Sequence, residues 1–450
     1  MKTMKLTTTP IVSLLALFVG FFFLSGCSDG LFSSEDGGQN THVTSSHKLR
    51  NGHLLDQAIK PAAAGKSEST TSLNLVISLN PASTIASFKV LERYKVLERY
   101  AYSEIFEGYA ISVEDSLGLE EFYSFLDTLD QDPNILWYEP DFNLNVIASS
   151  PVTGLPGQHI PWSVDAIGAT ESYALSGDGT GSVDVDLYIL DTGVTHPDVN
   201  VVEAIDFRDS ISTFSDPTDY DGHGTHIAGI AAAIDDTDGI VGIAPGARVH
   251  NLKVLGDDGL TDVSVVLAAV EYLTALKATN PAQPVIVNMS LVKDVGTPSY
   301  TALDEAIQVS AAVGVIYVIA AGNSYTTTAH VTPARVPEAI TVGAYDESGL
   351  FAPFSNWGPE IDLLAPGGGI LSLAADTTGL LPPVQMSGTS MAAGHVTGAV
   401  ALYVSQHPLA TPAEVSATLQ AEAQAFVVGA PPGTTNKSVW VGGNTNPPPN

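Results

Sequence analysis

The sequence has few basic residues and almost no cysteine. Lysine and arginine number 17 against 49 aspartate and glutamate residues in a chain of 450, a formal net charge of −32. Because a protein that binds nucleic acid needs a basic face, this composition argues against a nucleic-acid partner. The single cysteine, Cys27, excludes a disulfide within the chain. Hydrophobic residues make up 44% of the chain, enough for a large domain with a buried core and a smaller domain beside it.

Long apolar runs are also scarce, and the clearest one lies close to the first residue. Lys2 and Lys5 precede an apolar run from Ile11 to Leu24. This run is shorter than the ~20 residues of a membrane-spanning helix, and a charged start followed by such a run is typical of an export signal. We therefore predict a signal peptide over residues 1–26.

The end of this run reads Leu24-Ser-Gly-Cys27, which resembles the cleavage box of bacterial lipoproteins. The resemblance implies that the signal is cut before Cys27 and that its thiol is lipidated. It places the precursor in the bacterial cell envelope, in contact with the membrane only through the lipid on Cys27, and the mature protein in the periplasm or outside the cell. The alternative is an ordinary signal peptide with an accidental cysteine.

The next segments predict a tether and a small α+β module. Residues 27–70 are rich in small polar residues and predict a flexible tether. Residues 71–147 predict the order strand, helix, strand, helix, strand, from the apolar patterns at 73–79, 105–113, 119–129 and 137–141. The unit KVLERY occurs twice at 89–100, too short and too few for a repeat architecture.

From about residue 155 the pattern changes to alternating strands and helices. Short runs rich in β-branched residues predict strands, and Ala-rich stretches predict helices, over residues 152–430. This alternation predicts an α/β domain with a mainly parallel sheet and helices on both faces. Residues 431–450 predict a disordered tail. Because ligands of such sheets bind beyond the carboxyl ends of the strands, we look for chemistry there.

Four polar residues follow predicted strands or open predicted helices, namely Asp191, His223, Asn323 and Ser390. An aspartate can orient a histidine, a histidine can move a proton, and a serine at a helix start can act as a nucleophile. Taken singly, Asp191 and Asn323 read equally as turn residues and Ser390 as a helix N-cap. The four together favour catalysis.

The two histidines of Asp221-Gly-His-Gly-Thr-His226 raise the alternative of a zinc site. The helical zinc motif places its histidines four residues apart with a glutamate between them. His223 and His226 are three apart and the glutamate is missing, so we expect His223 to move a proton and His226 to pack into the core.

Several phrases closely resemble the subtilisin-like serine proteases. They are DTGV at 191–194, DGHGTHIAG at 221–229, AAGN at 320–323 and GTSMAAGHV at 388–396, and the resemblance covers about residues 158–425. The module at 71–147 resembles the propeptide of this family, which is an inhibitor and a folding assistant.

The resemblance implies a serine endopeptidase that acts through an acyl-enzyme. Ser390 would attack the peptide carbonyl, His223 would accept and return its proton, and Asp191 would hold the imidazole. Asn323 and the Ser390 N–H would stabilise the oxyanion. The substrates would be polypeptides, the precursor would be autoinhibited and cut off its own propeptide, and we expect a monomer.

Two departures from the family pattern stand out. Gly394 replaces a proline after the nucleophile, and a glycine inside a helix costs about 1 kcal/mol relative to alanine. In the substrate cleft, Val292 replaces a glycine. We expect it to narrow the specificity pocket and to favour small or medium residues before the cut. The resemblance assigns that pocket to Ser290, Leu291, Val292, Ala320, Ala321 and Gly322.

The resemblance also implies a structural calcium ion. The matching ligands are oxygens of Gln158, Asp198, Ile234, Asp236, Asp238 and Ile240. An all-oxygen set with several backbone carbonyls is what calcium binds.

Two alternatives to a general endopeptidase stay open. The first is a catalytically silent protein that binds peptides with a protease fold. The second is an enzyme that cuts only its own propeptide.

Overall fold

The structure is a computed structural model that describes most residues from Lys48 onwards. The described residues are 48–55, 59–61, 71–81, 94, 96–113, 119–145, 150–151, 157–208 and 216–443. The predicted signal peptide and Cys27 lie outside them. Among the described helices, none combines the length and the apolar character that a bilayer crossing requires.

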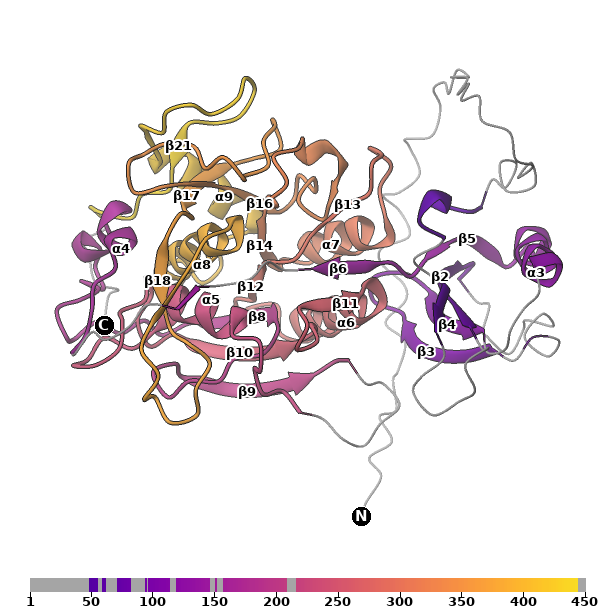
Figure 1. Ribbon diagram of the computed structural model, residues 1–450, viewed down its shortest axis with the longest axis horizontal. Helices are drawn as coiled ribbons and strands as arrows, with labels where there is room; N and C mark the ends of the chain where they lie inside the picture. Colours follow the sequence, from indigo (N-terminus) through magenta and orange to yellow (C-terminus); the bar gives the residue numbers. More distant parts are fainter. Residues whose placement is uncertain are drawn as a thin grey trace, which may run out of the picture. The chain divides into compact units, whose positions relative to one another are not determined.

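A nine-stranded sheet, with strands between residues 186 and 438, forms the centre of the larger part of the structure (Figure 1). Its order is β20-β21-β17-β16-β14-β12-β8-β10-β9, and every neighbouring pair is parallel except β20 with β21. In chain order the strands are β8 (Asp186–Asp191), β9 (Val201–Asp206), β10 (Arg248–Lys253), β12 (Ile286–Met289), β14 (Ile316–Ala320), β16 (Ile340–Tyr345), β17 (Leu363–Pro366), β20 (Gln424–Ala425) and β21 (Lys437–Ser438). The predicted parallel α/β architecture is confirmed.

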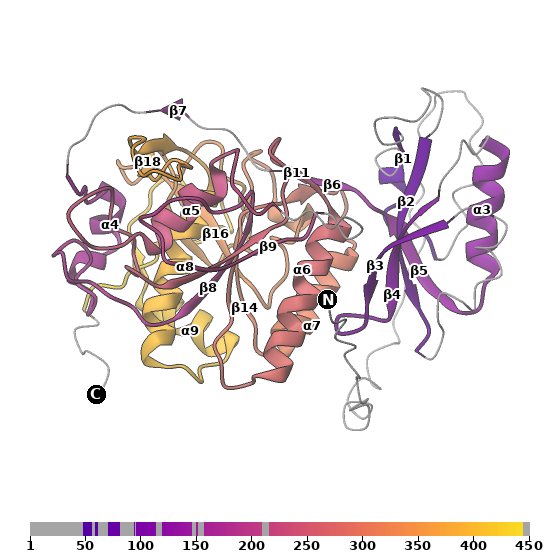
Figure 2. The same ribbon diagram turned by 90° about the horizontal axis from the view of Figure 1, so that it is seen from below.

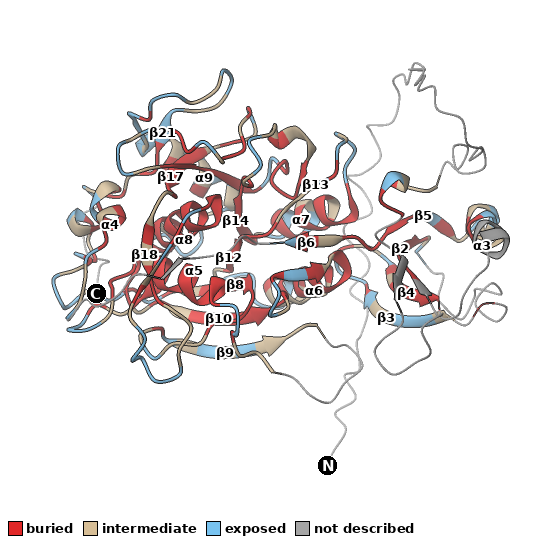
Figure 3. Cartoon of the chain, viewed as in Figure 1, coloured by how far each residue is buried: buried red, intermediate tan, exposed pale blue. Residues whose placement is uncertain are grey.

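Helices cover both faces of this sheet (Figure 2). They are α5 (His223–Ala232), α8 (Thr389–Gln406) and α9 (Pro412–Glu422) on one face, and α6 (Val263–Thr279) and α7 (Ala302–Ala312) on the other. The side chains of strand β8 are buried alternately on the two faces. Leu187 and Ile189 belong to the hydrophobic core under α5, α8 and α9, whereas Tyr188 and Leu190 belong to the core under α6 and α7. Burial on both faces explains why this strand reads as an unbroken apolar run (Figure 3).

The smaller part of the structure, with described elements between residues 59 and 140, is an antiparallel sheet of five strands together with helix α3. Its elements are β1 (Ile59–Pro61), β2 (Thr71–Leu79), β3 (Val96–Tyr102), β4 (Gly108–Val113), β5 (Ile135–Pro140) and α3 (Leu119–Gln131). The strand β3 is not among the apolar patterns from which the sequence predicted strands. Leu, Glu and Arg favour a helix locally, but Val and Tyr favour a strand, and pairing with β4 decides.

Two predicted boundaries need correction. Leu49 and residues 59–61, expected within the tether, join the small sheet: β1 pairs with β2, and Leu49 forms a bridge with Tyr138. Part of the predicted disordered tail joins the large sheet as β21, with Val439 and Val441 in its core. Both segments make only strands of two or three residues, too short for a periodic pattern to reveal.

Short elements complete the chain. They are η1 (Gly52–Leu54), α4 (Trp162–Ala166), η3 (Ala169–Glu171), η4 (Thr328–His330), and the strands β6 (Asn143–Asn145), β7 (Ser150–Pro151), β11 (Leu260–Asp262), β13 (Lys293–Asp294), β15 (Val331–Thr332), β18 (Ile370–Ser372) and β19 (Val384–Met386). β6 pairs with β11, and the strands β18, β19 and β7 form a small antiparallel sheet.

Close packing of α8 depends on Gly398. A Cβ built there would lie 2.5 Å from Ile243 Cβ and 3.1 Å from the carbonyl oxygen of Ala231. We expect Gly398→Ala to lower the free energy of unfolding by about 1–3 kcal/mol, because such overpacking forces neighbours to move. Urea unfolding of the full chain measures this, in a background carrying Ser390→Ala, which removes the predicted nucleophile.

Gly394→Ala is the matched control. Its Cβ would lie 3.3 Å from Ile230 Cβ, so a mild contact opposes a gain of about 1 kcal/mol in helix propensity. We expect a net change below about 1 kcal/mol. Equal effects of the two substitutions would contradict this account of the helix contact.

Candidate active site

The four residues singled out in the sequence lie at carboxyl ends of central strands or at helix starts. Asp191 ends β8 and Asn323 follows β14. His223 is the first residue of α5, and Ser390 is the second residue of α8. The parallel sheet therefore directs groups that are far apart in sequence to one edge.

A buried hydrogen bond joins Asp191 to His223. The distance from His223 Nδ1 to Asp191 Oδ1 is 2.7 Å, and both side chains are buried. Burial alone would lower the pKa of His223, but the charge of Asp191 and this hydrogen bond outweigh it and raise the pKa. Within the described residues, His223 Nε2 is buried and has no hydrogen-bond partner. The ring thus has one nitrogen fixed and the other available.

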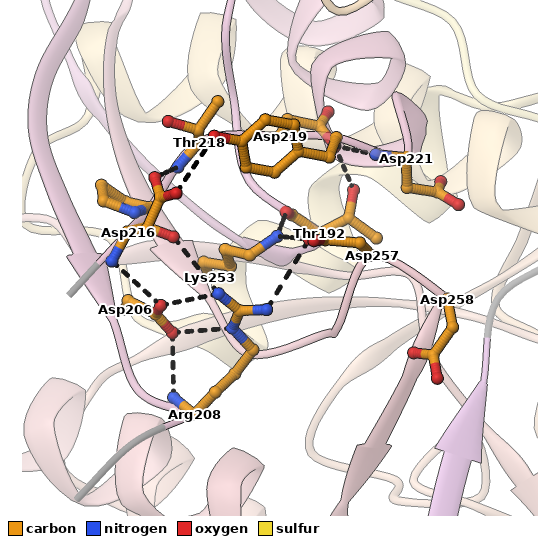
Figure 4. A network of polar contacts seen from close by, with 12 residues as sticks. Thr192, Asp206, Arg208, Asp216, Thr218, Asp219, Asp221, Lys253, Asp257 and Asp258 are labelled. Atoms are coloured by element: carbon orange, nitrogen blue, oxygen red, sulfur yellow. Dashed lines mark hydrogen bonds and ion pairs between the residues drawn. The ribbon is translucent and has the colours of Figure 1, made fainter. Parts of the chain in front are cut away.

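Asp219 holds the loop that precedes His223 (Figure 4). Its Oδ1 accepts hydrogen bonds from Thr192 Oγ1 at 2.9 Å and from the N–H of Gly222 at 2.8 Å. Its Oδ2 accepts from the N–H and the hydroxyl of Thr225, at 2.9 and 2.6 Å. One carboxylate therefore connects the strand carrying Asp191 with the helix carrying His223. The sequence analysis missed Asp219; its signal was an acid four residues before the histidine.

A buried lysine supports the same strand end. The ammonium of Lys253 donates to the carbonyl of Thr192 and, at 3.0 Å, to Asp257 Oδ1 (Figure 4). Its side chain has 0% exposure. Because a buried ammonium needs such acceptors, this contact fixes the residue next to Asp191.

His226 packs into the core, as expected. It has 0% exposure, and its Nε2 lies 3.1 Å from the carbonyl oxygens of both Ile370 and Val384. Burial lowers its pKa to about 3, so the ring stays neutral.

The helices that carry His223 and Ser390 pack against each other. Ile227 and Ile230 of α5 share a buried cluster with Met391 of α8, the residue after Ser390. The Ser390 hydroxyl donates to the carbonyl of Ser290 at 3.4 Å, and the Ser290 hydroxyl donates to the carbonyl of Ser390 at 3.3 Å. The nucleophile candidate is therefore tied to the strand end at Ser290.

Asn323 lies beside the start of α8. Its side-chain oxygen accepts hydrogen bonds from the N–H and hydroxyl of Thr389, at 2.8 and 3.0 Å. This fixes the amide and leaves its nitrogen as a donor. A Cβ built at Gly388 would lie 3.3 Å from Asn323 Nδ2 and 3.7 Å from the Ser390 nitrogen, so two nitrogens border the space that this glycine leaves open.

A pocket of about 70 Å³ opens beside Ser390. Of the predicted substrate-binding residues, it is lined by Ser290, Val292, Ala320 and Gly322. Val292 Cγ2 lies 3.1 Å from the position of a Cβ at Gly322, so the valine faces this wall. The lining does not include Leu291 and Ala321, whose side chains are buried in two of the hydrophobic cores.

Known proteins that resemble this chain identify both its family and the type of reaction that it catalyses. A sequence profile described as "Subtilase family" matches residues 184–441, which include Asp191, His223 and Ser390. The chain belongs to the subtilase family. This subtilase is a serine-type endopeptidase that acts on polypeptides, as the sequence predicts.

Relatives of this subtilase are serine proteinases. It is 34% identical over 325 residues to an extracellular serine proteinase of Thermus sp. (strain Rt41A), with 71% of each chain covered. It is 35% identical over 272 residues to subtilisin DY of Bacillus licheniformis, covering 59% of this chain and 92% of the relative. The crystal structure of a cold adapted subtilisin-like serine proteinase aligns with a TM-score of 0.52 and 32% identity, covering 62% of this chain and 97% of that one.

The residues matched to a calcium site in this subtilase gather around Asp198. Gln158 Nε2 donates to the carbonyl of Ile234 at 3.0 Å, and the Ile240 N–H donates to Asp198 Oδ2 at 3.4 Å. Burial raises the pKa of Asp198 to about 7, and the nearby charges of Asp236 and Asp238 add to this rise. No group of three or more His, Cys, Asp or Glu side chains arranged for a metal occurs in the described part of the chain.

Asp235 has a different role from its acidic neighbours. Its carboxylate accepts the N–H groups of Gly177, Gly179 and Gly181, at 3.0, 3.1 and 3.0 Å. Asp235 therefore fixes a neighbouring loop.

The pKa of His223 provides a test of the buried pair. In the full chain carrying Ser390→Ala, we expect the ring of His223 to titrate above its ordinary value of 6.5. Asp191→Asn removes the charge that opposes the burial effect, so the pKa should fall by about 1–3 pH units, to below the ordinary value. NMR of labelled histidine rings measures both values, with His223→Gln assigning the signal.

His226 is the internal control, because its ring makes no contact with Asp191 and should stay neutral in both variants across about pH 5–9. An unchanged His223 pKa in Asp191→Asn would contradict the electrostatic coupling.

Proposed function

We propose that Asp191, His223 and Ser390 are the catalytic triad of this endopeptidase. The observation that carries the proposal is the 2.7 Å bond between Asp191 and His223, which leaves a buried Nε2 without a partner among the described residues. That nitrogen belongs to helix α5, which packs against α8, the helix with Ser390 as its second residue.

The proton of the Ser390 hydroxyl is transferred to His223. Asp191 accepts the Nδ1–H of His223, so the unprotonated Nε2 can act as a base. The Ser390 hydroxyl turns from Ser290 towards Nε2, a rotation about one side-chain bond, and transfers its proton as its oxygen attacks the substrate carbonyl. His223 then returns the proton to the leaving amine, and water releases the acyl group by the reverse sequence.

Asn323 and the start of α8 stabilise the oxyanion. Asn323 Nδ2 and the Ser390 N–H border one space next to Gly388. The first N–H groups of a helix have no partner within the helix, and they lie at its positive end. Negative charge that develops on the substrate oxygen is therefore met by donors that are already in place.

The pocket beside Ser390 selects small or medium side chains. Its volume of about 70 Å³ and the position of Val292 leave little room for a large aromatic ring. Peptide substrates with a small aliphatic residue before the cut are therefore preferred.

The chain is an autoinhibited precursor in which residues 71–147 act as the inhibitor. Strand β6 pairs with β11 on one side, and Asn145 forms a bridge with Val292 on the other. Asn145 also lines the pocket that Ser390 lines. A segment lying between two strand edges in this way occupies the cleft as a substrate does.

Carboxylates of the inhibitor bind the starts of two helices. Asp141 accepts the N–H of Ser264 at 3.0 Å and its hydroxyl at 2.7 Å, and Glu139 accepts the N–H of Ala302 at 3.1 Å. In return, Glu271 of the catalytic part accepts three N–H groups of residues 103–105. Negative groups at helix starts are stabilising, so these contacts hold the inhibitor in place.

The register predicts where the precursor is cut. Asn145 lies opposite Val292 in antiparallel pairing, so a polypeptide that continues in this register brings its second following residue opposite Ser290. Because Ser390 contacts the Ser290 carbonyl, the bond after Ile147 is the expected cut.

The precursor is exported and lipidated at Cys27. Support comes from the charged and apolar run that ends in Leu24-Ser-Gly-Cys27 and from relatives such as the extracellular proteinase of Thermus sp.. Since Cys27 precedes the cut, the lipid would stay with the inhibitor, and the mature enzyme would be released when the inhibitor is degraded.

A calcium ion bound by Gln158, Asp198, Asp236 and the carbonyls of Ile234, Asp238 and Ile240 stabilises the fold. These residues fit the ion, because the raised pKa of Asp198 reflects a half-buried carboxylate near other acids. A divalent cation would relieve that repulsion. Turning the Gln158 amide would bring its oxygen next to the Ile234 carbonyl, as a shared cation requires.

Labelling and mass spectrometry test the function. We expect a fluorophosphonate probe to label the mature enzyme at Ser390 and mass spectrometry to find a cut after Ile147. Ser390→Ala should abolish labelling and remain full length, because the nucleophile is gone. Ser299→Ala, which removes an exposed serine outside the site, is the matched control and should behave as wild type.

Each remaining outcome points to another function. A chain that stays uncut and does not react with the probe would support a silent peptide-binding protein. A chain that matures but leaves casein intact would support an enzyme that cuts only its own propeptide.

Calcium removal tests the cation site. In Ser390→Ala, millimolar calcium should stabilise the full chain over chelator by about 2–4 kcal/mol, as expected for a ligand well above its dissociation constant. Calorimetry measures this as a higher melting temperature. Asp198→Asn should lose the increment without lowering stability in chelator, since it removes the repelled carboxylate.

Glu347→Gln, which removes an exposed acid elsewhere, is the control and should keep the full calcium effect. If the Ser390→Ala chain with Asp198 intact has the same melting temperature with and without calcium, the assignment of the calcium site is refuted.

A further inference from the structure

A loop connects β18 with β19 (Figure 1), and two leucines in this loop are exposed to solvent. Leu380 is 84% exposed and Leu381 is 54% exposed. We propose that Leu380 and Leu381 form a second substrate-recognition surface, which binds apolar side chains of the polypeptide on the leaving-group side of the cut. The proposal rests on Ser390 as the nucleophile.

The loop backbone is held in one conformation although its leucines are exposed. Asp376 Oδ2 accepts the N–H groups of Leu380 and Leu381 at 2.7 and 2.9 Å, and its Oδ1 accepts that of Thr378 at 2.9 Å. These hydrogen bonds hold the pKa of Asp376 well below its usual range. A fixed apolar tip is suited to binding, because little conformational freedom remains to be lost.

The base of the loop adjoins the catalytic histidine. A Cβ built at Gly222, the residue before His223, would lie 3.9 Å from Ala375 Cβ. The N–H of Asp376 donates to the carbonyl of Thr195 at 2.8 Å, which anchors the loop to the turn after β8. The loop that carries the two leucines therefore starts beside His223.

A segment of the chain itself gives the direction of the bound polypeptide. Ser150 pairs with Gln385 and Pro151 with Val384 in antiparallel register. A bound polypeptide that continues in this register would bring its next residues opposite Pro383, Pro382, Leu381 and Leu380 in turn. If its cut bond corresponds to the one after Ile147, the seventh and eighth residues past the cut would lie opposite the two leucines.

Recognition here depends on side chains. Pro382 and Pro383 have no N–H group, so they cannot donate hydrogen bonds to extend the β19 ladder towards the loop. The four residues before Val384 are two leucines and two prolines, and their side chains form an apolar surface. The occupant that fits it is an extended polypeptide with apolar residues at those positions.

Quenched peptides cut by the matured full-chain enzyme test this. A short peptide ends two residues past the cut, and two long peptides extend ten residues past it, with leucine or serine at the seventh and eighth positions. We expect kcat/KM to be about tenfold higher for the leucine peptide than for the serine peptide. The double variant Leu380→Ser/Leu381→Ser should lose this preference and cut the short peptide at the wild-type rate.

Leu409→Ser is the matched control, because Leu409 is 77% exposed but lies between α8 and α9. It should keep the preference. A preference that survives in the double variant, or is absent from the wild type, overturns the proposal. So does a double variant that changes only its binding to phosphatidylcholine vesicles or its oligomeric state. Failure of wild type to cut the short peptide would instead refute the assignment of Ser390.

Discussion

The hydrogen bond between Asp191 and His223 places specific demands on the structure around it. A carboxylate and an imidazole are both buried, so each must be held by groups that replace water. The fold supplies them through Asp219, which joins the loop before His223 to Thr192, and through Lys253, which binds the carbonyl of Thr192. Positioning of the base is thus distributed over several strand ends and does not depend on the two residues alone.

The parallel sheet makes this arrangement possible. Strands β8, β12 and β14 are neighbours, and their carboxyl ends bring Asp191, Ser290 and Asn323 to one edge. Helices α5 and α8 then return from that edge and place His223 and Ser390 in their first turns. One geometric rule therefore accounts for the positions of residues separated by up to 199 positions in sequence, from Asp191 to Ser390.

The sequence predicted the central parallel sheet well, because its buried strands are short apolar runs rich in β-branched residues that alternate with Ala-rich helical stretches. Strand β3 could not be predicted, since its local preferences were mixed and its pairing with β4 is not visible in sequence. β1 and β21 were missed because they have only three and two residues. The roles of Asp219 and Asp235 were missed because the sequence does not show which backbone N–H groups a carboxylate binds, although Asp219 stands four residues before His223.

The hydrogen bond that Asp141 accepts at the start of α6 bears on whether the enzyme can refold. The N-cap residue of α6, Asp262, makes no side-chain capping bond, and the acceptor for Ser264 comes from Asp141 instead. If the segment with Asp141 is removed after folding, as proposed above, the remaining chain no longer carries the group that favours nucleation of this helix. Once unfolded, such a chain would refold slowly, so its denaturation would be irreversible in practice.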